Sequence, residues 1–132
     1  MAGLELNGFD ELDRTLRELD VYDELAPQLI NGSVDILENN LKKEVSKHQK
    51  SGDMYNSIRP KKAQKNKYGW YAVVRPRGTD SNGVRNMDKM AYIEFGTSNQ
   101  SATPVIAPAV NKSLRDTEER MQQLFNEIVG EM

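Results

Sequence analysis

Residues 69–76 read Gly-Trp-Tyr-Ala-Val-Val-Arg-Pro, and this stretch decides the fold that the sequence predicts. Aromatic and β-branched side chains between a glycine and a proline favour a β-strand. Ile58 precedes the stretch, and we expect the two segments to pair as a β-hairpin. The connection over residues 60–67 is rich in lysine and lacks large apolar side chains, which predicts an exposed, mobile loop.

Two segments with helical spacing precede the hairpin. Apolar residues recur every three or four positions over residues 10–19 and again over residues 27–50, which predicts two amphipathic helices, with Pro27 in the first turn of the second. Gly32 weakens the second helix locally, and Gly52 stands where a left-handed cap is usual. The apolar positions are Phe9, Leu12, Leu16, Leu19, Ile30, Val34, Leu37, Leu41, Val45 and His48.

The segments after the hairpin complete the predicted fold. Residues 76–86 are rich in turn-forming types and predict a second long loop. Residues 90–95 fit a short strand or a helical turn equally well. Pro104 and Pro108 keep the backbone extended until a helix opens that keeps its apolar spacing to the C-terminus. The sequence therefore predicts a single α+β domain over residues 1–132, with helices packed on one face of a small antiparallel β-sheet and a long C-terminal helix.

The composition excludes several classes of protein. The chain has 132 residues, of which 37% are hydrophobic and none is cysteine. This length suits one compact domain. The lack of cysteine excludes disulfides, thiolate zinc sites and thiol nucleophiles. There is no run of about 18 apolar residues and no signal-like start, so we expect a soluble protein made in the cytoplasm without membrane contact.

Charge is divided unevenly along the chain, although the formal net charge is only -2. Residues 1–40 carry ten acids and two cations, a balance of -8, and residues 54–79 carry seven cations and no acid, a balance of +7. Such a division can attract an external polyanion, can join the basic part of one copy to the acidic part of the next, or can be a solvated surface. The candidate interface residues are Arg59, Lys61, Lys62, Lys65, Lys67, Arg75 and Arg77 on the basic side and Asp10, Glu11 and Glu18 on the acidic side.

Few side chains suit catalysis or metal binding. His48 is the one histidine and more simply caps the end of a helix, and neither a G-x-S-x-G turn nor a phosphate-binding G-x-x-x-x-G-K loop occurs. Glu94, which lies between apolar residues, is a tuned general acid or a carboxylate held by backbone amides or by a cation at a subunit contact. Because no second catalytic group accompanies it, we favour the second reading over a hydrolase built on Glu94 and Asp53. We expect no enzyme, no metal and no cofactor.

Aromatic residues are interleaved with the cations in the middle of the chain. They are Tyr55, Tyr68, Trp70 and Tyr71. This combination is compatible with a non-specific nucleic-acid-binding module that uses residues 59–77, and equally with a hairpin in a protein core.

Three segments resemble elements of one known family. Residues 51–58 (SGDMYNSI) are similar to T/S-G-x-L-x-x-S-I, residues 91–97 (AYIEFGT) to A-x-h-V/I-E-F/Y-G-T, and residues 103–109 (TPVIAPA) to x-P-F-h-x-P-A before a terminal helix, where h is hydrophobic. In this order and spacing they resemble the tail-completion or neck proteins of tailed bacteriophages, to which lambda minor tail protein Z is related. Met54 replaces the usual leucine and Val105 the usual aromatic residue, and both remain apolar.

The resemblance implies a structural virion component and not an enzyme. It implies a hexameric or dodecameric ring of this chain at the head–tail junction, between connector or head-closure proteins and the tail terminator or tail tube, with room for non-specific contact with packaged DNA. A terminator that caps the tail tube is the alternative role. We expect the matched residues to shape the fold, and Glu94 is also an interface candidate. The matched residues are Gly52, Ser57, Ile58, Glu94, Phe95, Gly96, Thr97, Pro104 and Pro108.

Overall fold

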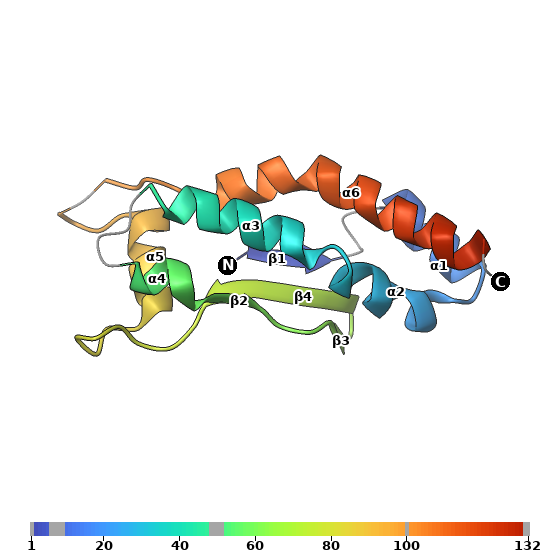
Figure 1. Ribbon diagram of the computed structural model, residues 1–132, viewed down its shortest axis with the longest axis horizontal. Helices are drawn as coiled ribbons and strands as arrows, with labels where there is room; N and C mark the ends of the chain where they lie inside the picture. Colours follow the sequence, from blue (N-terminus) through green and yellow to red (C-terminus); the bar gives the residue numbers. More distant parts are fainter. Residues whose placement is uncertain (1, 6–9, 48–51, 100, 131–132) are drawn as a thin grey trace.

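The structure, a computed structural model, describes residues 2–5, 10–47, 52–99 and 101–130 (Figure 1). Helices and a small antiparallel sheet form the predicted α+β fold, and a long helix ends it. The elements in chain order are β1 (Ala2–Glu5), α1 (Asp10–Glu18), α2 (Tyr22–Asn31), α3 (Val34–Val45), α4 (Asp53–Ser57), β2 (Ile58–Pro60), β3 (Gln64–Asn66), β4 (Gly69–Pro76), α5 (Asn86–Phe95) and α6 (Ile106–Gly130).

The central strand of the sheet is β4, which contains the stretch that the sequence singled out. Strand β1 pairs with one edge of β4, and β2 followed by β3 pairs with the other edge, all antiparallel. Tyr71 marks the two edges, because it lies opposite Glu5 on one side and opposite Gln64 on the other. The predicted hairpin is confirmed as β2 with β4. Strand β1 was not expected, because four residues are too few to establish an alternating pattern.

The edge formed by β2 and β3 contains a β-bulge. The pairing along β2 slips by one residue before β3, so Lys62 and Ala63 together stand opposite Ala72. The backbone N–H of Ala63 donates to Oδ1 of Asn31 at 2.9 Å, which ties the bulge to α2. The prediction of a loop over residues 60–67 is therefore wrong for β3. Backbone pairing with a free strand edge requires no apolar side chains, so the lysine-rich sequence did not reveal it.

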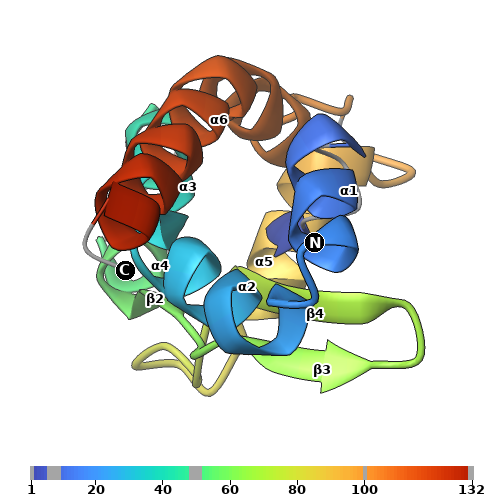
Figure 2. The ribbon, with the colours of Figure 1, turned by 90° about the vertical axis from the view of Figure 1, so that its right-hand side faces the viewer.

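Helices cover one face of the sheet. In Figures 1 and 2, α2, α3 and α6 lie on the same side of β4, while the opposite face of β3 and β4 carries no helix among the described elements. Apolar side chains of these helices meet the inner side chains of the sheet in one core. Its fully or nearly fully buried members include Leu25, Leu29, Ile30, Leu37, Leu41, Val45, Ile58, Ala72, Val74, Ala109 and Met121.

The helix predicted over residues 27–50 is in fact two helices, α2 and α3, with a break at Gly32. A Cβ atom on Gly32 would lie 2.7 Å from the side chain of Leu124 on α6, so glycine permits the close approach of α6 at the break. Pro27 lies inside α2, which begins at Tyr22, and not in a first turn as predicted. His48 lies outside the described residues.

The remaining predictions differ in their outcome. Helix α1 is confirmed, but Leu19 is exposed because the helix ends one residue earlier, and Phe9 lies outside the described residues. Most of residues 76–86 form the expected loop, and residues 90–95 belong to helix α5. Helix α6 is confirmed, but it begins at Ile106, so Pro108 lies in its first turn and the backbone before Pro108 is not extended throughout as predicted.

Candidate functional site

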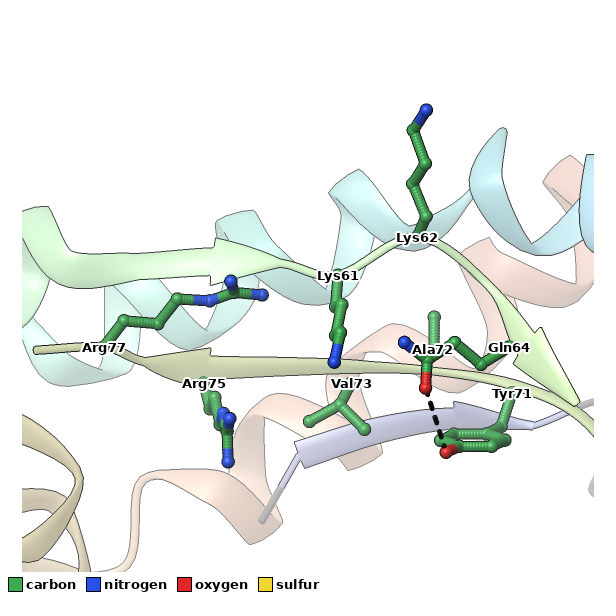
Figure 3. A pocket seen from close by; sticks show the side chains of 8 residues that line it. All are labelled: Lys61, Lys62, Gln64, Tyr71, Ala72, Val73, Arg75 and Arg77. Atoms are coloured by element: carbon green, nitrogen blue, oxygen red, sulfur yellow. Dashed lines mark hydrogen bonds between the residues drawn. The ribbon is translucent and has the colours of Figure 1, made fainter. Parts of the chain in front are cut away.

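The face of the sheet that no described helix covers bears a row of cations. Figure 3 shows Lys61 and Arg75 beside β4 on this face, and Arg77 just beyond the end of the strand. Arg59 of β2 lies directly opposite Arg75 in the strand register. Arg85, in the loop after β4, lines a hollow together with Arg75 and Arg77. We call Arg59, Lys61, Arg75, Arg77 and Arg85 the cationic strip.

The alternation of the strands places these side chains on the open face. Successive residues of a strand point to opposite faces of the sheet. In β4, Ala72 and Val74 are buried against the helices, whereas Arg75 between Val74 and Pro76 is exposed. The alternation thus buries Ala72 and Val74 and leaves Arg75 exposed on the open face.

The charges of the cationic strip have no ion-pair partner among the described residues. Eight ion pairs occur among the described residues, and none of them involves a member of the strip. Moreover, Arg59 and Arg75 form a directly opposite like-charge pair, an arrangement that destabilises a sheet by roughly 0.2–1 kcal/mol. Fold stability therefore does not account for the strip.

Two hollows along the strip offer space for an anion. One, of about 150 Å³, is lined by Lys61, Val73, Arg75 and Arg77 among others. The other, of about 200 Å³, is lined by Arg75, Arg77 and Arg85 among others. Arginine presents a planar fork of N–H donors that matches the oxygens of phosphate or carboxylate. An extended anion could thus bridge both hollows along Arg75 and Arg77.

The loop that carries Arg85 is folded around Asp80. One carboxylate oxygen of Asp80 accepts the backbone N–H groups of Asn82 and Val84, both at 2.9 Å, and the other accepts Nζ of Lys89 at 3.0 Å. The hydrogen bond from Lys89, followed by the one from the Val84 backbone, lowers the pKa of Asp80 below its usual value. The negative charge of Asp80 is thus compensated by Lys89 of α5 and by backbone N–H groups of the loop.

Asn86 fixes the backbone at the start of the same loop. Its Nδ2 donates to the carbonyl oxygen of Arg77 at 2.9 Å, and its backbone N–H donates to Gly78 at 3.0 Å. Sequence reasoning missed both Asn86 and Arg85. Arg85 lies beyond residues 54–79, over which the cations were counted. The available signal for Asn86 is its position between a loop and a helical pattern, where asparagine often bonds to the backbone.

Lys65 belongs to the predicted basic segment but not to the strip. The β-bulge reverses the alternation of β3, so Lys65 emerges on the helix side, where its Nζ lies 2.6 Å from Oδ1 of Asp23 on α2. The same oxygen accepts Nε1 of Trp70 at 3.0 Å. The bond from Lys65, and then that from Trp70, lowers the pKa of Asp23. Part of the basic segment thus meets part of the acidic segment within one chain.

Two further lysines of the basic segment differ in their relation to the strip. Lys62 stands at the bulge and borders the same hollow as Lys61, but its side chain points away from the sheet in Figure 3. The ammonium group of Lys67 lies 5.0 Å from the centre of the Tyr68 ring, at the turn between β3 and β4. The seven predicted cations therefore do not form one patch.

The acidic candidates lie on α1. Glu11 and Glu18 are exposed, whereas the side chain of Asp10 lies outside the described part of the chain. Asp13 pairs with Arg17 at 3.1 Å. Figure 1 shows α1 at one end of the molecule, while β2 and the loop after β4 lie toward the other end. The exposed acids and the cationic strip are thus separate surfaces.

Glu94 is buried and does not form an exposed interface. Its carboxylate accepts the backbone N–H groups of Val105 at 2.7 Å, Ile106 at 2.6 Å and Ala107 at 3.3 Å, where α6 begins. The first N–H groups of a helix have no partner in the helix, and its positive end favours a carboxylate. The structure thus shows that backbone amides hold the Glu94 carboxylate, as one of the predictions stated. Because its side chain is buried, Glu94 is not an exposed interface residue.

Other motif residues also shape the backbone, with one exception. Gly52 and Gly96 have φ angles of 82° and 77°, which favour glycine, and Ile58 is fully buried. Phe95, by contrast, is 75% exposed, and Tyr92 one turn earlier on α5 is 52% exposed. The segment thus presents two aromatic side chains to solvent.

The remaining motif residues make local contacts. The hydroxyl of Ser57 donates to a carbonyl of α4 at 2.7 Å, and Oγ1 of Thr97 accepts the N–H of Asn99 at 3.2 Å. Pro104 is exposed just before α6, and Pro108 is half-buried in its first turn.

Comparison with protein-family models, with curated proteins and with solved structures found no match to this chain. Within the described ranges, no group of three or more histidine, aspartate or glutamate side chains could hold a metal ion. No helix in that part of the chain is long and apolar enough to cross a membrane. The cationic strip and the exposed aromatic pair are the two candidate binding surfaces of the described residues.

Proposed function

We propose that this chain is a structural virion protein that forms a ring at the head–tail junction of a tailed phage. In this role it joins connector or head-closure proteins to the tail and performs no catalysis. The proposal rests on the three segments that resemble tail-completion proteins. The single observation that supports it best is the exposed aromatic pair, Tyr92 and Phe95, within one of those segments.

Hydrogen bonds anchor the backbone that carries the aromatic pair. Glu94, next to Phe95, is bonded to the start of α6, and the N–H of Thr103 donates to the carbonyl of Ile93 at 2.8 Å. Aromatic side chains on a fixed backbone contribute strongly at protein interfaces, because they bury much apolar area with little loss of conformational freedom. We propose that a neighbouring copy of the chain covers Tyr92 and Phe95 in the ring.

The positions of α1 and α5 fit a ring as well. A closed ring uses heterologous contacts, in which two different surfaces of each copy meet. Helix α1 lies at one end of the molecule, and α5 lies toward the other. Contacts made at opposite ends allow each copy to touch two neighbours.

The location of the protein is tested on purified phage particles from the host that encodes it. Mass spectrometry should detect the chain in the particles, and gold-labelled antibody should bind at the neck in electron micrographs. Absence from particles, or label confined to the capsid shell or the tail tip, would contradict the proposal. Particles made without the chain separate the two roles. Loss of a tail terminator would leave tails of irregular length, whereas loss of a neck protein would not.

The role of the aromatic pair is tested by a double variant, Tyr92→Ala with Phe95→Ala. We expect its thermal midpoint to match that of the wild type, because exposed side chains contribute little to stability, while rings no longer form on neck complexes. Leu114→Ala on α6, where the leucine is 49% exposed, is the matched control and should assemble normally. Normal assembly of the double variant would rule out this contact.

A further inference from the structure

We infer that the cationic strip binds the phosphate backbone of duplex DNA without reading its sequence. This inference goes beyond ring formation, because it concerns a different surface and can be tested on the isolated chain. It rests on five exposed cations that form no ion pair among the described residues: Arg59, Lys61, Arg75 and Arg77 along the open face of the sheet, and Arg85 in the adjoining loop.

The spacing of the strip suits a linear polyanion. Side chains two residues apart on one face of a strand, such as Arg75 and Arg77, are separated by roughly 6–7 Å, and the next strand lies about 4.8 Å away. Duplex DNA carries about one charge per 1.7 Å of its axis. The hollows beside Arg75 and Arg77 therefore lie within reach of several phosphates at once.

An acidic surface of another copy fits less well. Helix α1 carries four acids and two arginines, a balance of -2, and Asp13 is already paired with Arg17. Docking this helix on the strip, which carries five positive charges, would leave three of them without a partner. The like-charge pair of Arg59 and Arg75 would then remain repulsive, whereas a row of phosphates can neutralise both.

A duplex fits better than a single strand. Proteins that bind single strands stack the bases on exposed aromatic rings. On the strip, Tyr71 is half-buried and its hydroxyl donates to Oε1 of Gln64 at 3.3 Å. The Trp70 side chain is directed to Asp23 on the helix side of the sheet. Tyr71 borders one hollow of the strip, but its ring is only partly accessible, so the strip offers more to phosphates than to bases.

The test measures binding of the isolated chain to two fluorescent duplexes of unrelated sequence over a range of salt. If five phosphates are contacted, the slope of log K against log salt should be about -4.5, and affinity should fall roughly 500-fold between about 50 and 200 mM salt. The two duplexes should bind equally. A single strand and poly-glutamate of matched charge should bind more weakly.

A matched pair of double variants locates the binding surface. Arg75→Gln with Arg77→Gln should bring the slope to about -2.7 and weaken binding roughly 20-fold at about 200 mM salt. Arg14→Gln with Lys43→Gln removes the same charge from exposed residues outside the strip, where neither has an ion pair among the described residues, and should preserve binding. Circular dichroism should show both variants folded. Lys61→Gln with Arg85→Gln is the second strip variant, to be used if the first is unfolded.

Four results would overturn the inference: no binding to either duplex at about 50 mM salt, equal losses in the strip and control variants, tighter binding of poly-glutamate, or tighter binding of the single strand. Loss of self-association in the strip variant with unchanged DNA affinity would assign the strip to a contact between copies. Failure of the ring proposal leaves these measurements unaffected, because they need neither particles nor neighbouring copies.

Discussion

The carboxylate of Glu94 lies 2.6 Å from the backbone nitrogen of Ile106, the first residue of α6. This bond joins the end of α5 to the start of the longest helix across the connecting segment. It also ties residues 91–97 to residues 103–109, since the glutamate of the first segment supplies the hydrogen-bond acceptor for the backbone of the second.

Glu94→Ala should lower the free energy of unfolding by about 2–3 kcal/mol, because it leaves three N–H groups at the start of α6 without their charged acceptor. Urea denaturation measures the change. Glu118→Ala, on the exposed face of α6, should change stability by less than about 0.5 kcal/mol. Equal effects of the two substitutions would show that the Glu94 contact does not stabilise the fold.

Glu44 should make the stability of the protein dependent on pH. Hydrogen bonds from Lys112 on α6, and then from Lys47, lower the pKa of Glu44 below its ordinary value of 4.5. Because the folded state holds the ionised form, this stabilisation is present above pH 4.5 and is lost as the pH falls through the lower folded pKa. Urea denaturation of the wild type and of Glu44→Gln should therefore differ near neutral pH and converge in acid. A difference that is constant with pH would contradict this assignment.

Arg75→Glu should stabilise the isolated protein. The substitution converts the opposed pair with Arg59 into an attractive one, and a gain of about 0.2–1 kcal/mol in the free energy of unfolding is expected. The gain should shrink as salt screens the exposed charges. Arg77→Glu is the control, because Arg77 continues the ladder opposite the uncharged Ser57. A loss of stability in Arg75→Glu would contradict the register of β2 and β4.

Asp80→Ala should loosen the loop that carries Arg85 without unfolding the domain. The variant loses the acceptor of the Asn82 and Val84 amides, so their protection from hydrogen exchange should fall roughly ten-fold. Amides of β4 should keep their protection. Ser81→Ala in the same loop should leave exchange unchanged, and unaltered exchange in Asp80→Ala would show that this carboxylate does not order the loop.

The elements that the sequence predicted best are those with a long apolar period. Helix α6 and strand β4 could be recognised because their buried positions repeat at fixed spacing. The split between α2 and α3 could not, because apolar residues continue across Gly32 and the break depends on the approach of Leu124 from a distant helix. Strands β1 and β3 are short and are defined by backbone pairing, which leaves little trace in residue type.

The sequence predicts that the candidate site is basic, but not which residues belong to it. Counting residues located the basic segment and included Arg75 and Arg77. It could not separate Lys65 from Arg59 and Lys61, because the face on which a strand residue emerges depends on register. It also missed Arg85, which only the folded loop brings beside the strip.

The β-bulge is a point at which the length of the chain can change without disturbing β3. Lys61 lies opposite Val73 and Gln64 opposite Tyr71, so two residues, Lys62 and Ala63, stand where β4 supplies one. Removal of one of these two would leave a one-to-one pairing, and Lys65 would still lie opposite Trp70 on the side of Asp23. Homologues are therefore expected to vary in length at this point while the ion pair between Lys65 and Asp23 persists.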